Sequence, residues 1–235
     1  MRKIMLSLAG ALLCVPAFGT AVYTASSSST NVEADFTFGN GTLTLVLKNL
    51  IVDQTSDGQN ISSLSFTLPE NFATNIITDT SFSATDRSAI QKNVANGWTD
   101  APDTTSHWLL SNTTNTFNMT TLGFPMAPKT IIGAPNASNT YTNVNASITN
   151  QVHDPFYAVT ATWILSIPGV TAADEGNLSN VIFGFGTSAG VTETGSCDSC
   201  GGGGTTQTVT PEPVSFLLAG SGLALAGLIR FRRKA

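Results

Sequence analysis

The chain has 235 residues, of which 41% are hydrophobic and only 11% carry a charge, whereas about 25% charged is usual for a soluble globular domain. Coiled coils, basic nucleic-acid-binding domains and charge-rich disordered tails all need many Lys, Arg or Glu residues, so the composition excludes these classes. Residues 22–210 hold four basic residues against fourteen carboxylates, a net charge of −10. This acidic body repels phosphate backbones, and we expect no nucleic-acid partner.

The N-terminus has the pattern of a secretory signal peptide. A basic pair precedes an apolar run over residues 4–18, and Gly19 and Ala21 stand at the −3 and −1 positions of a cleavage site. We therefore predict a signal peptide over residues 1–21 and a mature chain that begins at Val22.

Two alternatives to a cleaved signal peptide are weaker. Lipid attachment at Cys14 would require a small residue at the preceding position, where Leu13 stands. An uncleaved anchor would need about 20 apolar residues, which is more than this run supplies.

A second apolar run lies near the C-terminus and predicts a transmembrane helix over residues 214–231. Its uncharged part, residues 214–229, would give roughly 24 Å of helix, a short span that can cross a bilayer with local thinning. Arg230, Arg232 and Arg233 follow it. By the positive-inside rule they hold the tail in the cytoplasm and leave the body outside.

Pro211, Glu212 and Pro213 stand directly before this helix. A Pro-Glu-Pro motif, a short apolar helix and an Arg-rich end, in that order, resemble the PEP-CTERM sorting signal of exported bacterial proteins. The resemblance implies that residues 211–235 are recognised through the motif by an exosortase, a membrane-embedded processing enzyme, while the arginines retain the tail. It also implies delivery of the body to the cell surface or an exopolysaccharide matrix. An ordinary single-span anchor is the alternative.

Between the body and the motif, residues 191–210 have the Gly- and Thr-rich composition of a flexible linker. Cys197 and Cys200 lie in this segment in a C-x-x-C arrangement. Because an exported chain meets an oxidising compartment, we predict a local disulfide between them. Free or metal-bound thiols remain alternatives.

The body alternates between apolar and polar residues with a period of two, which predicts an all-β fold. The clearest strands are at residues 42–52, 62–68, 158–167 and 181–187. Shorter strands are expected at residues 34–38, 107–111, 117–122, 129–132 and 141–148, and one short helix at residues 86–94. Strands at this spacing predict an antiparallel β-sandwich or jelly roll over residues 22–190.

The body also resembles a group of exported PEP-CTERM proteins whose activity is not established. The resembling stretches are residues 38–50, 58–68, 129–135, 145–156 and 181–187, together with the His107-Trp108 pair. This resemblance implies the class of protein, an exported PEP-CTERM protein, and its location outside the cell. None of the resembling stretches is a catalytic signature.

Sugar binding is the most specific function that the body suggests. Aromatic rings on such folds stack on pyranose rings, and Trp98, Trp108, Tyr141 and Tyr157 are the candidate glycan contacts. Trp163 lies on the apolar face of its strand, which predicts a core position.

We predict no catalytic residues, no metal site and no cofactor. His153 and Asp154 resemble half of a catalytic dyad, but adjacent residues on a strand point to opposite faces. Paired carboxylates keep a secreted hydrolase as the third alternative. Asp53 and Asp57 resemble part of a calcium loop without the alternating carboxylates that an EF-hand needs.

The sequence as a whole predicts a non-enzymatic, exported protein. We expect it to pass through the inner membrane and to reach the cell surface or the extracellular matrix, with the exosortase, the export machinery and the exopolysaccharide as its partners.

Overall fold

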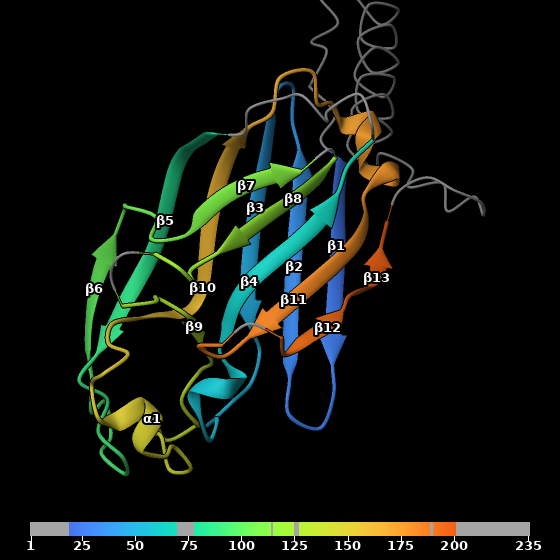
Figure 1. Ribbon diagram of the computed structural model, residues 1–235. Helices are drawn as coiled ribbons and strands as arrows, with labels where there is room; N and C mark the ends of the chain where they lie inside the picture. Colours follow the sequence, from blue (N-terminus) through green and yellow to red (C-terminus); the bar gives the residue numbers. More distant parts are fainter. Residues whose placement is uncertain (1–18, 70–77, 114, 125–126, 189, 201–235) are drawn as a thin grey trace, which may run out of the picture. The chain divides into compact units, whose positions relative to one another are not determined.

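The structure is a computed structural model that describes residues 19–69, 78–113, 115–124, 127–188 and 190–200 (Figure 1). The chain divides into two units, residues 1–202 and 203–235, and the second unit lies wholly outside the described residues. The predicted sorting signal at residues 211–235, with its transmembrane helix, is therefore outside the described part. Within the described residues, no helix is both long and apolar enough to cross a bilayer.

The described chain is all-β, and its strands form two layers that face each other (Figure 1). The first layer has the order β13 (Ser196–Ser199), β1 (Gly19–Ser26), β2 (Asn31–Phe38), β3 (Thr42–Asn49), β10 (Phe156–Ser166), β5 (Thr78–Ser88) and β6 (Thr99–Asp103). The second layer has the order β12 (Thr192–Thr194), β11 (Ser179–Phe185), β4 (Ile61–Thr67), β8 (Thr116–Thr120) and β7 (Leu109–Thr113). Neighbours within each layer are antiparallel. The short strand β9 (Ile131–Ile132) links the layers, because it pairs with both β10 and β4.

Alternation along the strands places one face of each inner strand in the core. In β3, Leu43, Leu45 and Leu47 are fully buried, whereas Thr44 and Lys48 face outward and are half-buried. The period of two predicted for this segment is therefore confirmed, although the strand ends at Asn49.

The strand register aligns large apolar side chains in a row across the first layer. Phe36 stands opposite Leu45, which stands opposite Trp163, which stands opposite Phe82. Trp163 is fully buried, so its predicted core position is confirmed. The row lies in the half of the main hydrophobic core that the first layer supplies.

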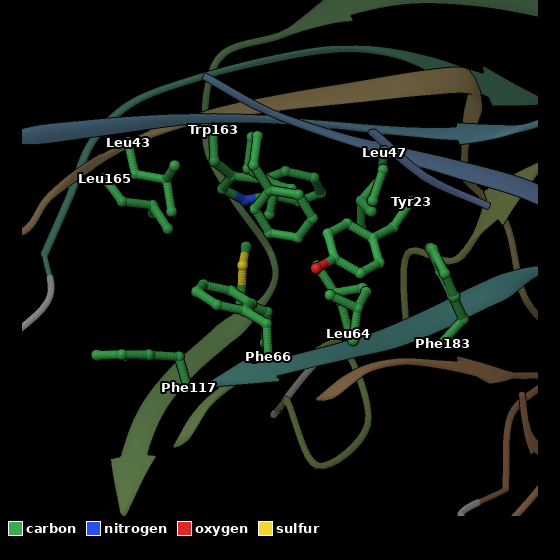
Figure 2. Close-up of a cluster of buried hydrophobic side chains, with 14 of the residues drawn as sticks. Tyr23, Leu43, Leu47, Leu64, Phe66, Phe117, Trp163, Leu165 and Phe183 are labelled. Carbon is green, nitrogen blue, oxygen red and sulfur yellow. The ribbon is translucent and has the colours of Figure 1, made fainter. Parts of the chain in front are cut away.

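The second layer supplies the other half of the core (Figure 2). Leu64, Phe66, Phe117 and Phe183 point from its strands toward the side chains of the first layer. Phe66 and Phe117 stack with ring centroids 5.4 Å apart, and Phe66 meets Phe36 edge-on at 5.2 Å. Close-packed rings of this kind add to the stability that apolar burial supplies.

A second, smaller core lies beside the helix α1 (Ala146–Thr149). Its buried members are Ile90, Ile132, Tyr141, Val144, Ile148 and Phe156, and Trp98 packs partly against them.

Two predicted elements are wrong. Residues 86–94 are not helical, because β5 continues to Ser88 and Arg87 pairs with both Phe156 and Asp100 on its neighbours. Residues 141–148 do not form a strand, because the Asn145 side chain accepts a hydrogen bond from the Ser147 amide and caps α1.

The fold also reaches beyond both predicted ends of the body. At the N-terminal end β1 begins at Gly19, so the predicted cleavage after Ala21 falls inside a strand. At the C-terminal end β12 pairs with β11 and β13 pairs with β1. Their backbone pairing makes residues 192–199 part of the fold, whereas the sequence placed them in the linker.

Candidate functional site

Two hollows lie side by side, and residues at the connection between β11 and β12 line both of them. The larger has a volume of about 520 Å³ and lies over the outer face of β4, β8 and β11; we name it the serine hollow. The smaller has a volume of about 260 Å³ and is lined by Asp57; we name it the aspartate hollow. Phe185, Ser188 and Val191 line both.

The serine hollow is lined by both apolar and polar side chains, and none of them is charged. The alternation that turns Leu64 and Phe66 into the core turns Ser63 and Ser65 outward, beside Asn118 on the neighbouring strand. Gly184 also lines the hollow, and a Cβ at this position would collide with the Ser63 hydroxyl. Hydroxyl and amide groups without a charged partner suit a neutral, hydroxyl-rich ligand.

A buried carboxylate, that of Asp57, lines the aspartate hollow. Asp57 is only 3% exposed, and its Oδ1 accepts hydrogen bonds from Asn60 Nδ2 at 2.7 Å and from Thr130 Oγ1 at 3.3 Å. Asn60 Oδ1 in turn accepts from Gln54, whose own Oε1 accepts from the Gly133 amide at 2.7 Å. The network joins two segments of the chain, residues 54–60 and 130–133, and satisfies polar groups that burial would otherwise make costly.

Burial raises the pKa of the Asp57 carboxyl above its ordinary value, because a charge is poorly solvated there. The charge of the neighbouring His153 and the hydrogen bonds from Thr130, Asn60 and Thr187 offset part of this effect. The carboxyl therefore ionises less readily in the folded chain than in water.

Residues 186–190 read Gly-Thr-Ser-Ala-Gly, which is the G-x-S-x-G spacing of a hydrolase nucleophile turn. Ser188 in this pattern lines the aspartate hollow together with His153 and Asp57. In α/β-hydrolases, however, this pattern lies on a sharp turn that connects a strand to a helix. Here it connects two antiparallel strands, β11 and β12. The sequence match therefore lacks the backbone context that gives such a serine its reactivity.

Other side chains of reactive type hold the backbone in place. The Ser147 hydroxyl donates to Asn145 Oδ1 at 2.7 Å and accepts from the Asp57 amide at 3.0 Å, so its proton does not point at a base. Asp154 Oδ2 accepts from the Ala89 amide at 2.7 Å, while His153 lines the aspartate hollow. His153 and Asp154 are adjacent in the sequence, but their side chains therefore lie in different surroundings and do not act as a pair.

The suggested calcium loop does not converge on one point. The Asp53 carboxylate accepts from the Thr142 amide at 2.6 Å and from Asn143 Nδ2 at 3.0 Å, which fastens the loop before α1. Asp57 instead binds Asn60 and Thr130.

The four aromatic residues predicted to contact glycans do not form a surface platform. Trp108 is 3% exposed, and Tyr141 and Tyr157 are fully buried, so their rings cannot stack on a sugar from solvent. Trp98 is half-buried; it packs edge-on against Tyr141 and lies under the Arg87 guanidinium at 4.5 Å. The polar group of each buried ring forms a hydrogen bond inside the protein. For example, Tyr141 Oη donates to the Gly133 carbonyl at 2.7 Å.

The predicted sorting residues Pro211, Glu212, Pro213, Arg230, Arg232 and Arg233 lie outside the described residues. Cys197 and Cys200 are described, and a disulfide joins them at a Cα separation of 6.0 Å. Cys197 lies in the exposed strand β13, and Cys200 directly follows this strand. No protein-family model matches the chain, and no curated protein matches it.

Proposed function

We propose that this is an exported protein whose non-catalytic β-sandwich body is sorted by an exosortase to the cell surface or an exopolysaccharide matrix. The observation that carries the proposal is the order of parts at the C-terminal end. The last strand of the described residues ends at Ser199, Cys200 and the glycine run 201–204 follow it, and the Pro-Glu-Pro motif begins seven residues after Gly204. A folded body, a Gly- and Thr-rich segment and the Pro-Glu-Pro motif thus follow each other along the sequence without overlap.

The charges and polar groups of the body support this reading. The acidic body does not suit an anionic membrane surface or nucleic acid. The side chains of Ser147, Asp154 and Asp53 form hydrogen bonds that hold turns and loops. The export machinery and the exosortase bind the terminal segments of the chain. The protein crosses the inner membrane on its way to the cell surface.

The sorting signal is tested by replacing Pro211, Glu212 and Pro213 together with alanine in the full chain. If the exosortase reads the motif, the variant stays at full length in the inner membrane, and most of the surface-delivered protein is lost. Immunoblots of membrane, surface and medium fractions measure this.

The matched control replaces Thr205, Thr206 and Thr208 with alanine, which changes as many residues in the adjoining tether. The control should be sorted like the natural chain. Unchanged surface delivery of the motif variant would contradict the proposal.

A second candidate function is carbohydrate binding, and the serine hollow is the observation that favours it. Its volume of about 520 Å³ falls within the range of small-molecule sites. Ser63, Ser65 and Asn118 present donors and acceptors that match sugar hydroxyls. This site replaces the buried aromatic residues as the place where a neutral glycan would bind.

Filling the serine hollow tests this candidate. We expect Ser65→Tyr to weaken retention of the exported protein on the producing cell's exopolysaccharide at least about tenfold, a loss of about 1.4 kcal/mol of binding free energy. Thr44→Tyr, on the outer face of the other layer, is the control and should be retained normally. A natural protein that elutes with the unbound fraction would eliminate the binding function, and release of soluble sugar would favour the hydrolase instead.

A further inference from the structure

The first three residues of β1 are integral to the fold. In the ladder, Gly19 stands opposite Phe38, Thr20 opposite Thr37, and Ala21 opposite Phe36. Ala21 has no exposed surface and belongs to the main hydrophobic core.

Gly19 is fitted closely to the 3-10 helix η3 (Ala172–Asn177). A Cβ at Gly19 would lie 2.5 Å from Glu175 Oε2 and 2.7 Å from the Ala172 carbonyl oxygen, so only glycine fits without displacement. Farther along the same strand, Tyr23 Oη donates to the Leu178 carbonyl at 2.7 Å, just after η3. β1 therefore packs closely against this segment at Gly19 and is hydrogen-bonded just after it through Tyr23.

A chain cut after Ala21 would lose this arrangement. It would lack three ladder pairs, the buried Ala21 methyl group and the glycine that faces η3. Phe36 and Phe38, both fully buried, would lose their neighbours on one side.

We propose that the signal peptide is removed before β1, by cleavage between Ala17 and Phe18. This inference rests on the proposed export. Val15 and Ala17 occupy the −3 and −1 positions of that bond, and the apolar run from residue 4 to residue 14 has a usual length for a signal peptide. One water molecule hydrolyses the peptide bond, which leaves a carboxylate on Ala17 and an α-ammonium group on Phe18.

Signal peptidase acts on the unfolded chain, so folding does not block either bond. Both bonds follow a suitable alanine, and the fold distinguishes between their products. Only cleavage at Ala17 delivers a chain that can form all of β1.

N-terminal sequencing of the exported protein, expressed from the full-length chain in the producing cells, tests the proposal. We expect the sequence to begin Phe18, Gly19, Thr20. A start at Val22 would overturn the cleavage position while leaving export intact. A retained Met1 on protein that has reached the surface would overturn both the cleavage position and the signal peptide.

A pair of variants at Phe18 gives a second measurement. Phe18→Pro turns the scissile bond into an X-Pro tertiary amide that lacks an N–H. We therefore expect cleavage after Ala17 to fall at least about tenfold, and N-terminal sequencing should no longer find mature chains that begin at position 18. Phe18→Ala keeps an ordinary amide and should be cleaved as in the natural chain. For cleavage after Ala21, position 18 is remote from the bond, and equal processing of both variants would contradict the proposal.

Discussion

Lys129→Met is expected to lower the free energy of unfolding by about 3–5 kcal/mol at pH 7. The Lys129 side chain is 8% exposed, and its Nζ lies 2.6 Å from Asp103 Oδ2 and 2.8 Å from Asp86 Oδ2. Removing the cation leaves two partly buried carboxylates facing each other without a counter-charge. Urea unfolding of the purified exported protein and its variant measures the difference.

The pH dependence of this loss has a defined sign. Burial tends to raise the pKa of the Asp103 carboxyl, but the hydrogen bonds from Lys129 and Thr105 and the nearby positive charges outweigh it, so the pKa lies below its ordinary value. A carboxyl with a depressed folded pKa stabilises the protein above its unfolded pKa, and this stability is lost as the pH falls through the folded pKa. The difference between the natural chain and Lys129→Met should therefore shrink below about pH 4.

Lys48→Met is the matched control, because Lys48 also pairs with two carboxylates, those of Glu33 and Asp35. Its side chain is 29% exposed, and solvent screens the charges. We expect a loss of less than about 1 kcal/mol. Equal losses for the two lysines would contradict the view that burial makes Lys129 special.

The strands of the core could be predicted because apolar and polar residues alternate along each of them. Residues 42–52, 62–68, 158–167 and 181–187 alternate between apolar and polar residues, and each contains a strand of the core. This agreement follows from the period of two that a half-buried strand imposes.

The strands β5, β6 and β13 carry no such pattern. In β5 only Phe82 enters the main core, and the strand is held by backbone pairing on both sides and by ion pairs such as Arg87 with Asp100 at 2.7 Å. In β13 every residue is exposed, and pairing with β1 alone defines the strand. Tertiary pairing of this kind overrides local propensity, which explains the wrong helix at residues 86–94.

The candidate site could be predicted only in part, because its polar groups come from distant segments. Asp57 and Thr130 are 73 residues apart, yet they share a hydrogen bond. Similarly, Tyr157 Oη accepts from the His107 amide, 50 residues away, at 3.1 Å. The local sequence around a tyrosine does not reveal whether its hydroxyl finds a partner inside the protein, and for this reason the sequence does not distinguish the buried Tyr157 from an exposed tyrosine. One local signal did exist, the G-x-S-x-G spacing around Ser188 at the rim of both hollows.

Trp163→Ala is expected to cost about 3–5 kcal/mol of unfolding free energy, the usual range for removing a large buried ring. Trp163 packs against Phe82 and Trp108 with ring centroids 5.2 Å and 5.1 Å away, and Leu45 stands opposite it on β3. The surrounding sheet cannot collapse onto the space left, because its strands are held by their ladders. Urea unfolding followed by circular dichroism measures the loss.

Two further variants separate packing from hydrogen bonding at this position. Trp163→Phe keeps a ring but removes the indole N–H that donates to Ser106 Oγ at 2.9 Å, so we expect a smaller loss of about 1–3 kcal/mol. Thr162→Ala changes the neighbouring residue, which is half-buried on the outer face of β10, and should stay within about 0.5 kcal/mol of the natural chain. A Trp163→Ala variant that unfolds at the same urea concentration as Thr162→Ala would show that the row of rings between the layers does not carry the stability of the fold.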